Sequence, residues 1–436
     1  MQDSVDRQPI AASGSLSGSG MPSERHVVRT VVAASIGAVF EWYDLLIYAM
    51  FVPTLSKLFF PTADPAVGVL LSLGTFASAW LVRPLGAVVI GSYADKVGRK
   101  PAMVLSAVLM MIGTGITGLL PGYASIGVAA PALLVLARLV QGFSAGGEFG
   151  SATALLAEQD PARAGFYASI QWACSGFAVF IASLVAYAVN TTLSPAEVLE
   201  WGWRVPFLLG VLIGPVAWYI RTRADESPLF AASAHASSPL REVAVHDKWR
   251  VLLGAGVVAA GAAGSFMNQY MPTFAIANLH LSASQALIGT LVAGLINSVM
   301  PMVSGHLSDR FGRIPLMMMF GVVGLVMTYP LFLWIVSSPS LVNLVIVQAL
   351  LALVMYSGYF AIAPALLSDL FQVRRRTTGI SIAYVLGQLL FGGVTPLVAG
   401  LLVMQTGSPS SPGLYLTAII ALSLGSLMLC RRLGVR

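Results

Sequence analysis

Long apolar stretches separated by short polar segments run through nearly the whole chain. Crossing the roughly 30 Å hydrocarbon core of a bilayer takes about 20 helical residues, and twelve stretches are long enough. They cover residues 27–50, 66–93, 102–120, 131–157, 164–190, 203–221, 250–277, 284–306, 314–336, 340–367, 378–404 and 412–430. A helix satisfies its own backbone hydrogen bonds in lipid. The pattern therefore predicts an all-α polytopic membrane protein with twelve transmembrane helices.

The longest polar segment between these stretches divides the predicted helices into two sets of six. It covers residues 222–249, and we expect it to be a linker on the cytoplasmic side. The sets form an N-terminal bundle over residues 27–221 and a C-terminal bundle over residues 250–430. Residues 1–26 are rich in Ser and Gly, have no cleavable signal pattern and predict a disordered tail, and residues 431–436 form a short second tail.

Composition excludes a soluble protein. Apolar residues make up 57% of the chain and charged residues 10%, against roughly 45–50% and 25% in soluble domains. The net charge of +6 does not indicate a nucleic-acid partner. If both termini are cytoplasmic, 20 of the 24 Lys and Arg residues fall in cytoplasmic loops and tails, which is the distribution that sets membrane orientation.

Enzyme motifs are missing from the sequence. The five histidines and two cysteines have no spacing typical of a metal site. Neither a phosphate-binding loop nor a dinucleotide fingerprint occurs. We therefore expect no enzymatic activity, no cofactor and no metal, and an ion gradient as the energy source.

One loop motif occurs twice, once in each predicted bundle. Residues 91–101 read GSYADKVGRKP and residues 305–315 read GHLSDRFGRIP, a shift of 214 residues. A second echo joins Leu-Ala-Glu at 156–158 to Leu-Ser-Asp at 367–369, each followed by an arginine. Parallel repeats of six helices are typical of transporters that bind their substrate between two halves.

The repeated motif resembles the loop signature of the major facilitator superfamily, and other segments resemble its metabolite:proton symporter branch. These segments are FEWYD at 40–44, RPLG at 83–86, RLVQGFSAGGE at 138–148 and WGWRVPF at 201–207, and YMPTF at 270–274 with LSAS at 281–284 is closer to the citrate-type members. Members of this branch import citrate and other tricarboxylates, 2-oxoglutarate, shikimate, and proline or betaine. The resemblance implies two six-helix halves around a central cavity, a monomer in the bacterial inner membrane, and transport by alternating access.

Ionisable residues inside the apolar stretches are concentrated in the N-terminal bundle. Glu41, Asp44, Arg83, Arg138 and Glu148 lie there, whereas the interiors of the C-terminal stretches have none. By helix rise, Glu41, Arg83 and Glu148 lie about 15–18 Å from the cytoplasmic ends of their helices, near the midplane of the bilayer. Because each such group costs at least about 2.5–3.5 kcal/mol to insert, we expect these residues to have a function.

Glu41 and Asp44 are the expected proton-coupling pair, with Glu148 as a further candidate. A nearby arginine keeps a carboxyl group ionised, and an anion that binds the arginine lets the carboxyl group take up a proton. Arg83 and Arg138 are the expected anion-binding partners, because a guanidinium group can contact a carboxylate with two hydrogen bonds. The alternative is a static buried network of all five residues that fixes helix packing.

Further polar residues are expected to line the substrate path. They are Gln141, Gln171, Asn268, Gln269, Tyr270, Asn297, Tyr356, Tyr359 and Gln388. Asn268, Gln269 and Tyr270 precede Pro272, where an interrupted helix can expose its backbone to a substrate. Asn297 occupies the repeat position of Arg83. The alternative for each is a hydrogen-bonded core residue.

The two repeated loops are expected to act as a cytoplasmic gate. The resemblance implies that their charged residues lock the helix ends on this side and release them during transport. An aspartate near a helix N-terminus and an arginine near a helix C-terminus also suit the helix dipole. The expected gate residues are Asp95, Arg99, Glu158, Asp309, Arg313 and Asp369.

These observations predict a secondary active transporter that symports protons with small organic acids, di- or tricarboxylates such as citrate or 2-oxoglutarate. Its expected partners are the organic anion, the proton and the lipid bilayer. One alternative is a proton symporter of zwitterionic osmolytes such as proline or betaine. Another is a passive facilitator or a sensor of the same fold, although neither needs acidic groups at the midplane.

Overall fold

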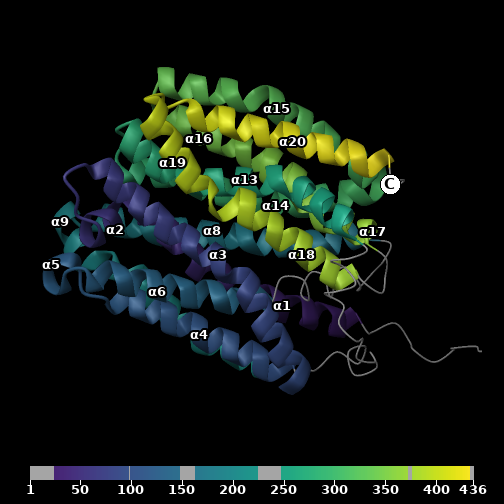
Figure 1. Ribbon diagram of the computed structural model, residues 1–436, viewed down its shortest axis with the longest axis horizontal. Coiled ribbons are helices and arrows are strands. Elements are labelled where there is room, and N and C mark those ends of the chain that lie inside the picture. The colour runs from purple at the N-terminus through teal and green to yellow at the C-terminus, as the bar shows by residue number, and fades with distance from the viewer. Residues whose placement is uncertain (1–23, 98, 148–162, 224–246, 372–375, 433–436) are drawn as a thin grey trace, which may run out of the picture.

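The computed structural model describes residues 24–97, 99–147, 163–223, 247–371 and 376–432. These residues form helices joined by short turns, and no strand occurs among them. Figure 1 shows the helices running side by side, with α2, α5 and α9 at one end of the molecule and α17 and the end of α20 at the other. The all-α prediction is confirmed.

The N-terminal half, residues 24–223, contains the following helices. They are α1 (Glu24–Met50), α2 (Val52–Phe59), α3 (Pro65–Val97), α4 (Arg99–Leu119), α5 (Tyr123–Ile126), α6 (Ala129–Ser144), η1 (Ala145–Gly147), α8 (Ala164–Thr192), α9 (Pro195–Glu197), η3 (Val198–Gly202) and α10 (Arg204–Arg223).

The C-terminal half, residues 247–432, forms a second, neighbouring group of helices (Figure 1). They are α13 (Lys248–Asn278), α14 (Ala283–Phe311), α15 (Arg313–Ser337), α16 (Leu341–Leu351), η4 (Ala352–Tyr359), η5 (Phe360–Ile362), α17 (Ala363–Leu370), α18 (Arg376–Gln388), η7 (Leu389–Gly393), α19 (Thr395–Thr406) and α20 (Ser411–Arg432).

Eight helices of the described residues are long and apolar enough to cross a membrane, or nine if the bent pair α1 and α2 counts as one span. Shorter apolar helices cover Val104–Leu119 and Ala129–Ser144. So many long apolar helices require a lipid environment, because their outward faces would be exposed to water otherwise. The chain is therefore an integral membrane protein.

A bend follows the first predicted stretch, and two later stretches are less regular than expected. α1 ends at Met50, and α2 continues at an angle of 64°. Pro53 lies in the first turn of α2, where its missing N–H group costs no hydrogen bond. The stretches at 340–367 and 378–404 contain the π-helical segments η4 and η7. Such segments insert an extra residue into a helical turn and are frequent at functional sites.

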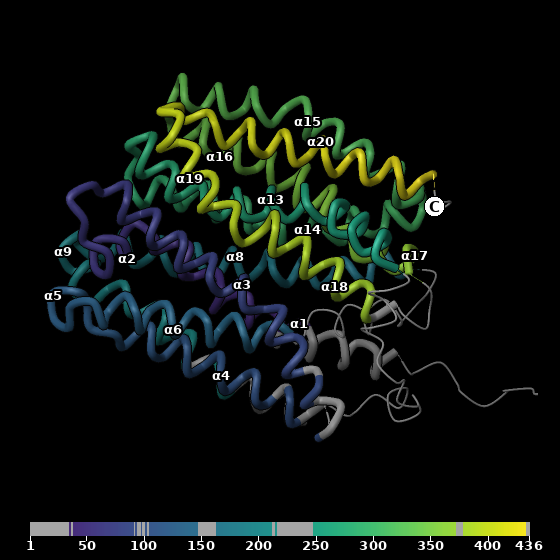
Figure 2. Tube along the Cα trace, viewed as in Figure 1, coloured from purple at the N-terminus to yellow at the C-terminus, as the bar shows by residue number. Residues whose placement is uncertain are grey.

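Helices α8 and α14 join the two halves along an extended antiparallel contact (Figure 2). Glycines make this close approach possible. A side chain at Gly176 would collide with the backbone of Asn297, and the Cβ atom of a side chain at Gly294 would lie 2.6 Å from the amide nitrogen of Phe180. Small residues at such a contact let two helix backbones gain van der Waals contact with each other in lipid.

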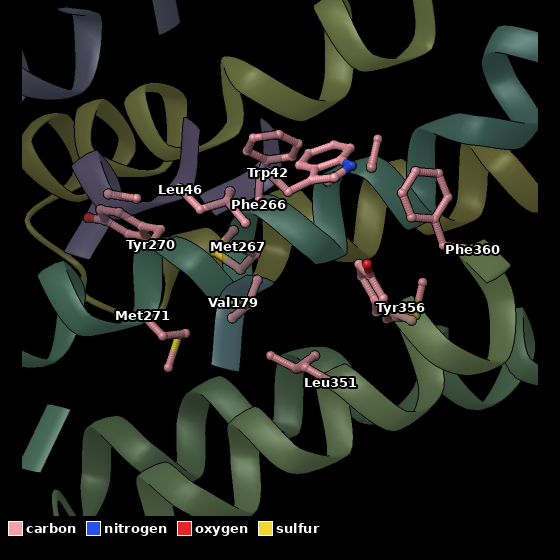
Figure 3. Close-up of a cluster of buried hydrophobic side chains, with 14 of the residues drawn as sticks. Trp42, Leu46, Val179, Phe266, Met267, Tyr270, Met271, Leu351, Tyr356 and Phe360 are labelled. Atoms are coloured by element: carbon pink, nitrogen blue, oxygen red, sulfur yellow. The ribbon is translucent and has the colours of Figure 1, made fainter. Parts of the chain in front are cut away.

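Aromatic and aliphatic side chains fill the middle of the contact between the halves (Figure 3). Trp42 from α1 lies near Phe266 from α13, while Tyr356 and Phe360 approach from η4 and η5. These side chains are buried. The few polar groups among them are therefore in a setting of low dielectric, where each interaction is strengthened and each unpaired group is costly.

A methyl group at Gly176 tests the α8–α14 contact. We expect Gly176→Ala to lower the free energy of unfolding by about 1–3 kcal/mol, as overpacking does. Gly74→Ala is the matched control, because nothing lies within 4 Å of the added Cβ atom. Replacing glycine by alanine raises the intrinsic helix propensity by the same amount at both positions. Thermal unfolding in detergent measures the difference, and equal midpoints for the two variants would contradict the contact.

Candidate functional site

Glu41 and Arg83 form an ion pair between α1 and α3. Arg83 Nη2 lies 3.8 Å from Glu41 Oε1, and the two side chains are 8% and 17% exposed. The helix-rise estimate had placed both residues at the same depth. The structure adds that they face each other, so the charge of one offsets the charge of the other in an apolar setting.

Aromatic rings surround the guanidinium group of Arg83. Its carbon atom lies 3.9 Å from the centre of the Trp80 ring and 5.7 Å from that of Trp42. Trp80 meets Phe266 of α13 edge to face, with ring centres 4.7 Å apart. The Glu41–Arg83 pair therefore lies where the N-terminal half meets the C-terminal half.

The C-terminal half contributes a tyrosine and a glutamine to this region. Tyr384 of α18 lies within electrostatic range of both Arg83 and Glu41. Its hydroxyl oxygen accepts a hydrogen bond of 2.6 Å from Gln388 Nε2. Trp172 of α8 lies between this tyrosine and η4, with its ring centre 6.1 Å from that of Tyr384. The polar groups of the two halves thus meet among aromatic rings.

Tyr356 connects η4 to the N-terminal half directly. Its hydroxyl group donates a hydrogen bond of 2.8 Å to the backbone oxygen of Trp172. The same tryptophan packs on Phe360, with ring centres 4.0 Å apart. This predicted substrate-path residue therefore lies at the contact between the halves.

Arg138 lies inside the N-terminal half and is fully buried. Its Nη1 atom donates a hydrogen bond of 2.8 Å to Gln141 Oε1, and its Nη2 atom donates one of 3.4 Å to the backbone oxygen of Leu45. Its guanidinium carbon lies 4.6 Å from the centre of the Tyr48 ring. Gln141 in turn donates a hydrogen bond of 2.8 Å to Thr114 of α4. All of these partners belong to the N-terminal half.

Asp44 belongs to this second cluster. It interacts electrostatically with Arg138, and its Oδ1 atom lies against Gly210 of α10, where a side chain would collide with it. Glu41 is only one helical turn away but contacts Arg83 of α3 instead. The structure therefore places the two predicted proton-coupling acids against different neighbours.

Several predicted residues of the C-terminal half have hydrogen-bond partners within that half. Asn268 Nδ2 donates to the backbone oxygen of Gln348 at 3.2 Å. Asn297 Oδ1 accepts from Ser357 at 3.0 Å, and the hydroxyl groups of Tyr359 and Ser423 lie 2.8 Å apart. The equivalence of Asn297 to Arg83 in the internal repeat did not identify Ser357 as its partner.

Other buried polar atoms have no hydrogen-bond partner among the described residues. Gln388 Oε1, Gln269 Oε1, the hydroxyl group of Thr273 and Trp80 Nε1 are of this kind. Gln171 is buried on α8 and Tyr270 on α13. Such unpaired groups are rare in protein cores, and a buried one calls for an explanation such as a ligand or water.

Some residues of this site were not predicted from the sequence. They are Trp42, Trp80, Trp172, Thr273 and Tyr384. Trp80 precedes Arg83 by three residues, which places the two on the same face of a helix. That spacing was the available signal for Trp80. Thr273 lies four residues after Gln269 and could have been found in the same way.

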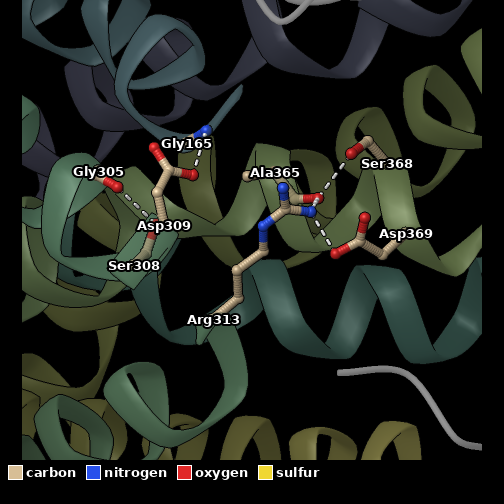
Figure 4. Close-up of polar contacts among 8 residues, drawn as sticks. All are labelled: Gly165, Gly305, Ser308, Asp309, Arg313, Ala365, Ser368 and Asp369. Atoms are coloured by element: carbon tan, nitrogen blue, oxygen red, sulfur yellow. Dashed lines mark hydrogen bonds and ion pairs between the residues drawn. The ribbon is translucent and has the colours of Figure 1, made fainter. Parts of the chain in front are cut away.

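The gate residues fall into two groups (Figure 4). Asp309 at the end of α14 accepts hydrogen bonds of 2.8 Å and 3.0 Å from the backbone amides of Gly165 and Phe166 at the start of α8. A carboxylate at a helix N-terminus is stabilised by the helix dipole. Arg313 pairs instead with Asp369 of its own half and donates to the backbone oxygen of Ala365 at 2.6 Å. Asp309 therefore joins the halves, and the Arg313–Asp369 pair does not.

Some predicted residues cannot be placed. Glu148 and Glu158 lie outside the described residues, and the side chains of Asp95 and Arg99 are outside the described part as well. Their expected roles stay predictions.

Comparison with known proteins identifies the family. The sequence profile described as Major Facilitator Superfamily matches residues 34–339 and 277–434. The chain is 33% identical over 407 residues to a citrate-proton symporter of Salmonella typhi, which covers 90% of this chain and 93% of that protein. It is 32% identical over 416 residues to a proline/betaine transporter of Salmonella typhimurium (strain LT2), which covers 91% of this chain and 82% of that protein.

A solved structure has the same fold. The crystal structure of a D-xylose-proton symporter superposes with a TM-score of 0.70 at 18% identity, covering 92% of this chain and 96% of that one. At this identity the likeness concerns the fold alone. With the family match over most of the chain, the conclusion is plain: the protein belongs to the major facilitator superfamily and is a transporter, not an enzyme.

Proposed function

We propose that this protein symports protons with small organic acids across the bacterial inner membrane by alternating access. It acts as a monomer with twelve spans in two six-helix bundles and with both termini in the cytoplasm. The observation that carries the proposal is the placement of acids beside arginines inside apolar helices: Glu41 forms an ion pair with Arg83, and the buried Asp44 interacts electrostatically with Arg138. Such groups are costly in a membrane and mark proton or ion pathways.

The two acid–arginine pairs have different tasks in this proposal. Arg138 is enclosed by groups of its own half, so it holds Asp44 and influences its proton. Arg83 borders the other half and is the arginine that a substrate carboxylate can reach. When the carboxylate binds Arg83, it weakens the hold of Arg83 on Glu41, and Glu41 takes up a proton. Proton binding and substrate binding then favour each other.

Di- and tricarboxylates such as citrate or 2-oxoglutarate are the proposed substrates. The relative described as a citrate-proton symporter supports this class, and Arg83 supplies a group that binds carboxylates. The relative described as a proline/betaine transporter supports zwitterionic osmolytes as the second candidate. Aromatic rings bind quaternary ammonium groups, but the guanidinium group of Arg83 already occupies the face of Trp80.

Neutralising the two acids tests the proton coupling. One proton crossing 100 mV releases about 2.3 kcal/mol, enough for roughly fiftyfold accumulation. We expect Asp44→Asn and Glu41→Gln to abolish this accumulation, whereas exchange of labelled for unlabelled substrate continues. The measurement is uptake into proteoliposomes with an imposed pH gradient, using citrate, other di- and tricarboxylates, shikimate and betaine in turn.

Glu200→Gln is the matched control for these variants. Glu200 is exposed beyond the end of α8, so its neutralisation leaves gradient-driven uptake unchanged. If Asp44→Asn and Glu41→Gln both still accumulate substrate against its gradient, the acids do not couple transport to protons.

A second prediction concerns closure at the proposed cytoplasmic end. Asp309→Asn weakens two charged hydrogen bonds to α8, and a hydrogen bond to an ionised group is worth about 1.5–3 kcal/mol. We expect the halves to separate more often at this end. A cysteine in place of the buried Ser308, in a variant lacking Cys174 and Cys430, reports the change through faster labelling by a membrane-impermeant thiol reagent, on the order of tenfold.

Asp369→Asn is the control for this experiment, because its partner Arg313 lies in the same half. It leaves the labelling rate of the cysteine at position 308 near that of the parent. Equal acceleration by both aspartate variants would show that Asp309 does not hold the halves together.

A further inference from the structure

Arg83 is the positively charged residue that lies beside polar side chains of the other half in the aromatic middle of the contact. Arg83 lies 3.9 Å from the centre of the Trp80 ring, which touches Phe266 of the other half, and it interacts electrostatically with Tyr384 of that half. Arg138 lies farther from the Phe76 ring, at 5.5 Å, and its hydrogen-bond partners are Gln141 and Leu45 of its own half. In the described part of the C-terminal half, every lysine and arginine lies at a helix end. These residues are Lys248, Arg250, Arg310, Arg313, Arg376, Arg431 and Arg432.

The C-terminal half presents neutral acceptor atoms at this contact instead. Gln388 Nε2 already donates to Tyr384, and Gln388 Oε1 has no partner among the described residues. Gln269 Oε1, a further acceptor, and the hydroxyl group of Thr273, which can accept or donate, also lack partners there. The three side chains are only 2%, 4% and 1% exposed. A carbonyl oxygen accepts a hydrogen bond from an O–H group and offers nothing to a carboxylate.

These acceptors face the N-terminal half. On α13, the positions of Phe266, Gln269 and Thr273 share one face by helical spacing, and the Phe266 ring touches Trp80 of the other half. Gly392 leaves room for Gln388 Oε1 beside the same Phe266 ring. The donors at Arg83 and the acceptors therefore lie on opposite sides of one contact.

Electrostatics limits the charge that can be bound here. Glu41 cancels the charge of Arg83 while it is ionised, and the Asp44–Arg138 pair is neutral as a unit. When Glu41 is protonated and Asp44 is ionised, one positive charge remains among these four side chains. A single carboxylate neutralises it, whereas a second ionised carboxylate would be left without a compensating charge among aromatic rings, which is strongly unfavourable.

We infer that the protein binds its substrate as a monoanion. One carboxylate binds Arg83, with the Nε1–H group of Trp80 as a second donor, and hydroxyl groups or protonated carboxyl groups bind the oxygens of Gln388 and Gln269 and the hydroxyl group of Thr273. The substrate is thus a hydroxylated monocarboxylate, or a polycarboxylate such as citrate with its other carboxyl groups protonated. This inference rests on the proposed transport of organic acids and specifies the charge of the bound species.

Binding of citrate derivatives to the purified full-length protein at one neutral pH tests the inference. The probes are citrate, which is then mainly the trianion, its dimethyl ester with one carboxylate, and its trimethyl ester with none. Quenching of tryptophan fluorescence reports binding, because Trp42, Trp80 and Trp172 surround the site. We expect the dimethyl ester to bind about tenfold or more tightly than citrate. The trimethyl ester does not bind the wild-type protein, and the Arg83→Gln variant binds none of the probes.

A second cation should shift this preference. In Gln388→Lys we expect citrate to gain about tenfold or more relative to the dimethyl ester. Gln405→Lys, which adds the same charge at the exposed end of α19, leaves the ratio unchanged. The wild-type comparison stands even where the Gln388 variant does not fold.

Two results would count against the inference and are distinguishable. If citrate binds the wild-type protein as tightly as its dimethyl ester, the monoanion is wrong, while proton-coupled transport of organic acids stands. If none of the probes binds and no organic acid accumulates in proteoliposomes, both the inference and the proposed function are overturned.

Discussion

The cost of a charge in an apolar helix bundle governs the organisation of this protein. Among the described residues of the N-terminal half, Asp44, Arg83 and Arg138 are buried and Glu41 is 17% exposed, and each acid interacts with an arginine of the same half. Aromatic rings cover the guanidinium groups, which lowers the cost of burying them further. The protonation of each acid therefore depends on what else its arginine contacts. In the proposed mechanism, substrate binding at an arginine is thereby linked to proton exchange at the neighbouring acid.

The contacts between the halves are of a different kind. Helices α8 and α14 meet through glycines, Trp80 and Trp172 pack on rings of the other half, and Tyr356 donates to a backbone oxygen. These interactions are short in range and are lost over a small displacement. The halves can therefore be tightly packed in one arrangement and still separate in another.

The sequence was sufficient for the all-α fold and for the common level of Glu41 and Arg83, but not for the contacts between the helices. Helix rise placed Glu41 and Arg83 at one level because rise depends only on residue spacing. It could not distinguish the neighbours of Glu41 and Asp44, since the arrangement of helices around α1 decides which side chain each one meets. For the same reason, the position of Asn297 in the internal repeat could not predict its hydrogen bond with Ser357. The π-helical turns of η4 and η7 have no periodicity that the apolar pattern could reveal.

The placement of ion pairs bears on the energy of alternating access. Among the described residues, the Glu41–Arg83 and Arg313–Asp369 ion pairs each lie within one half. Breaking a buried ion pair costs about 3–5 kcal/mol, so pairs that bridged the halves would resist every opening. A rocking motion that moves each half as a unit leaves these pairs intact. A charged contact that does cross between the halves is that of Asp309 with two backbone amides. It lies at one end of the molecule, where water can replace the lost hydrogen bonds as the halves part.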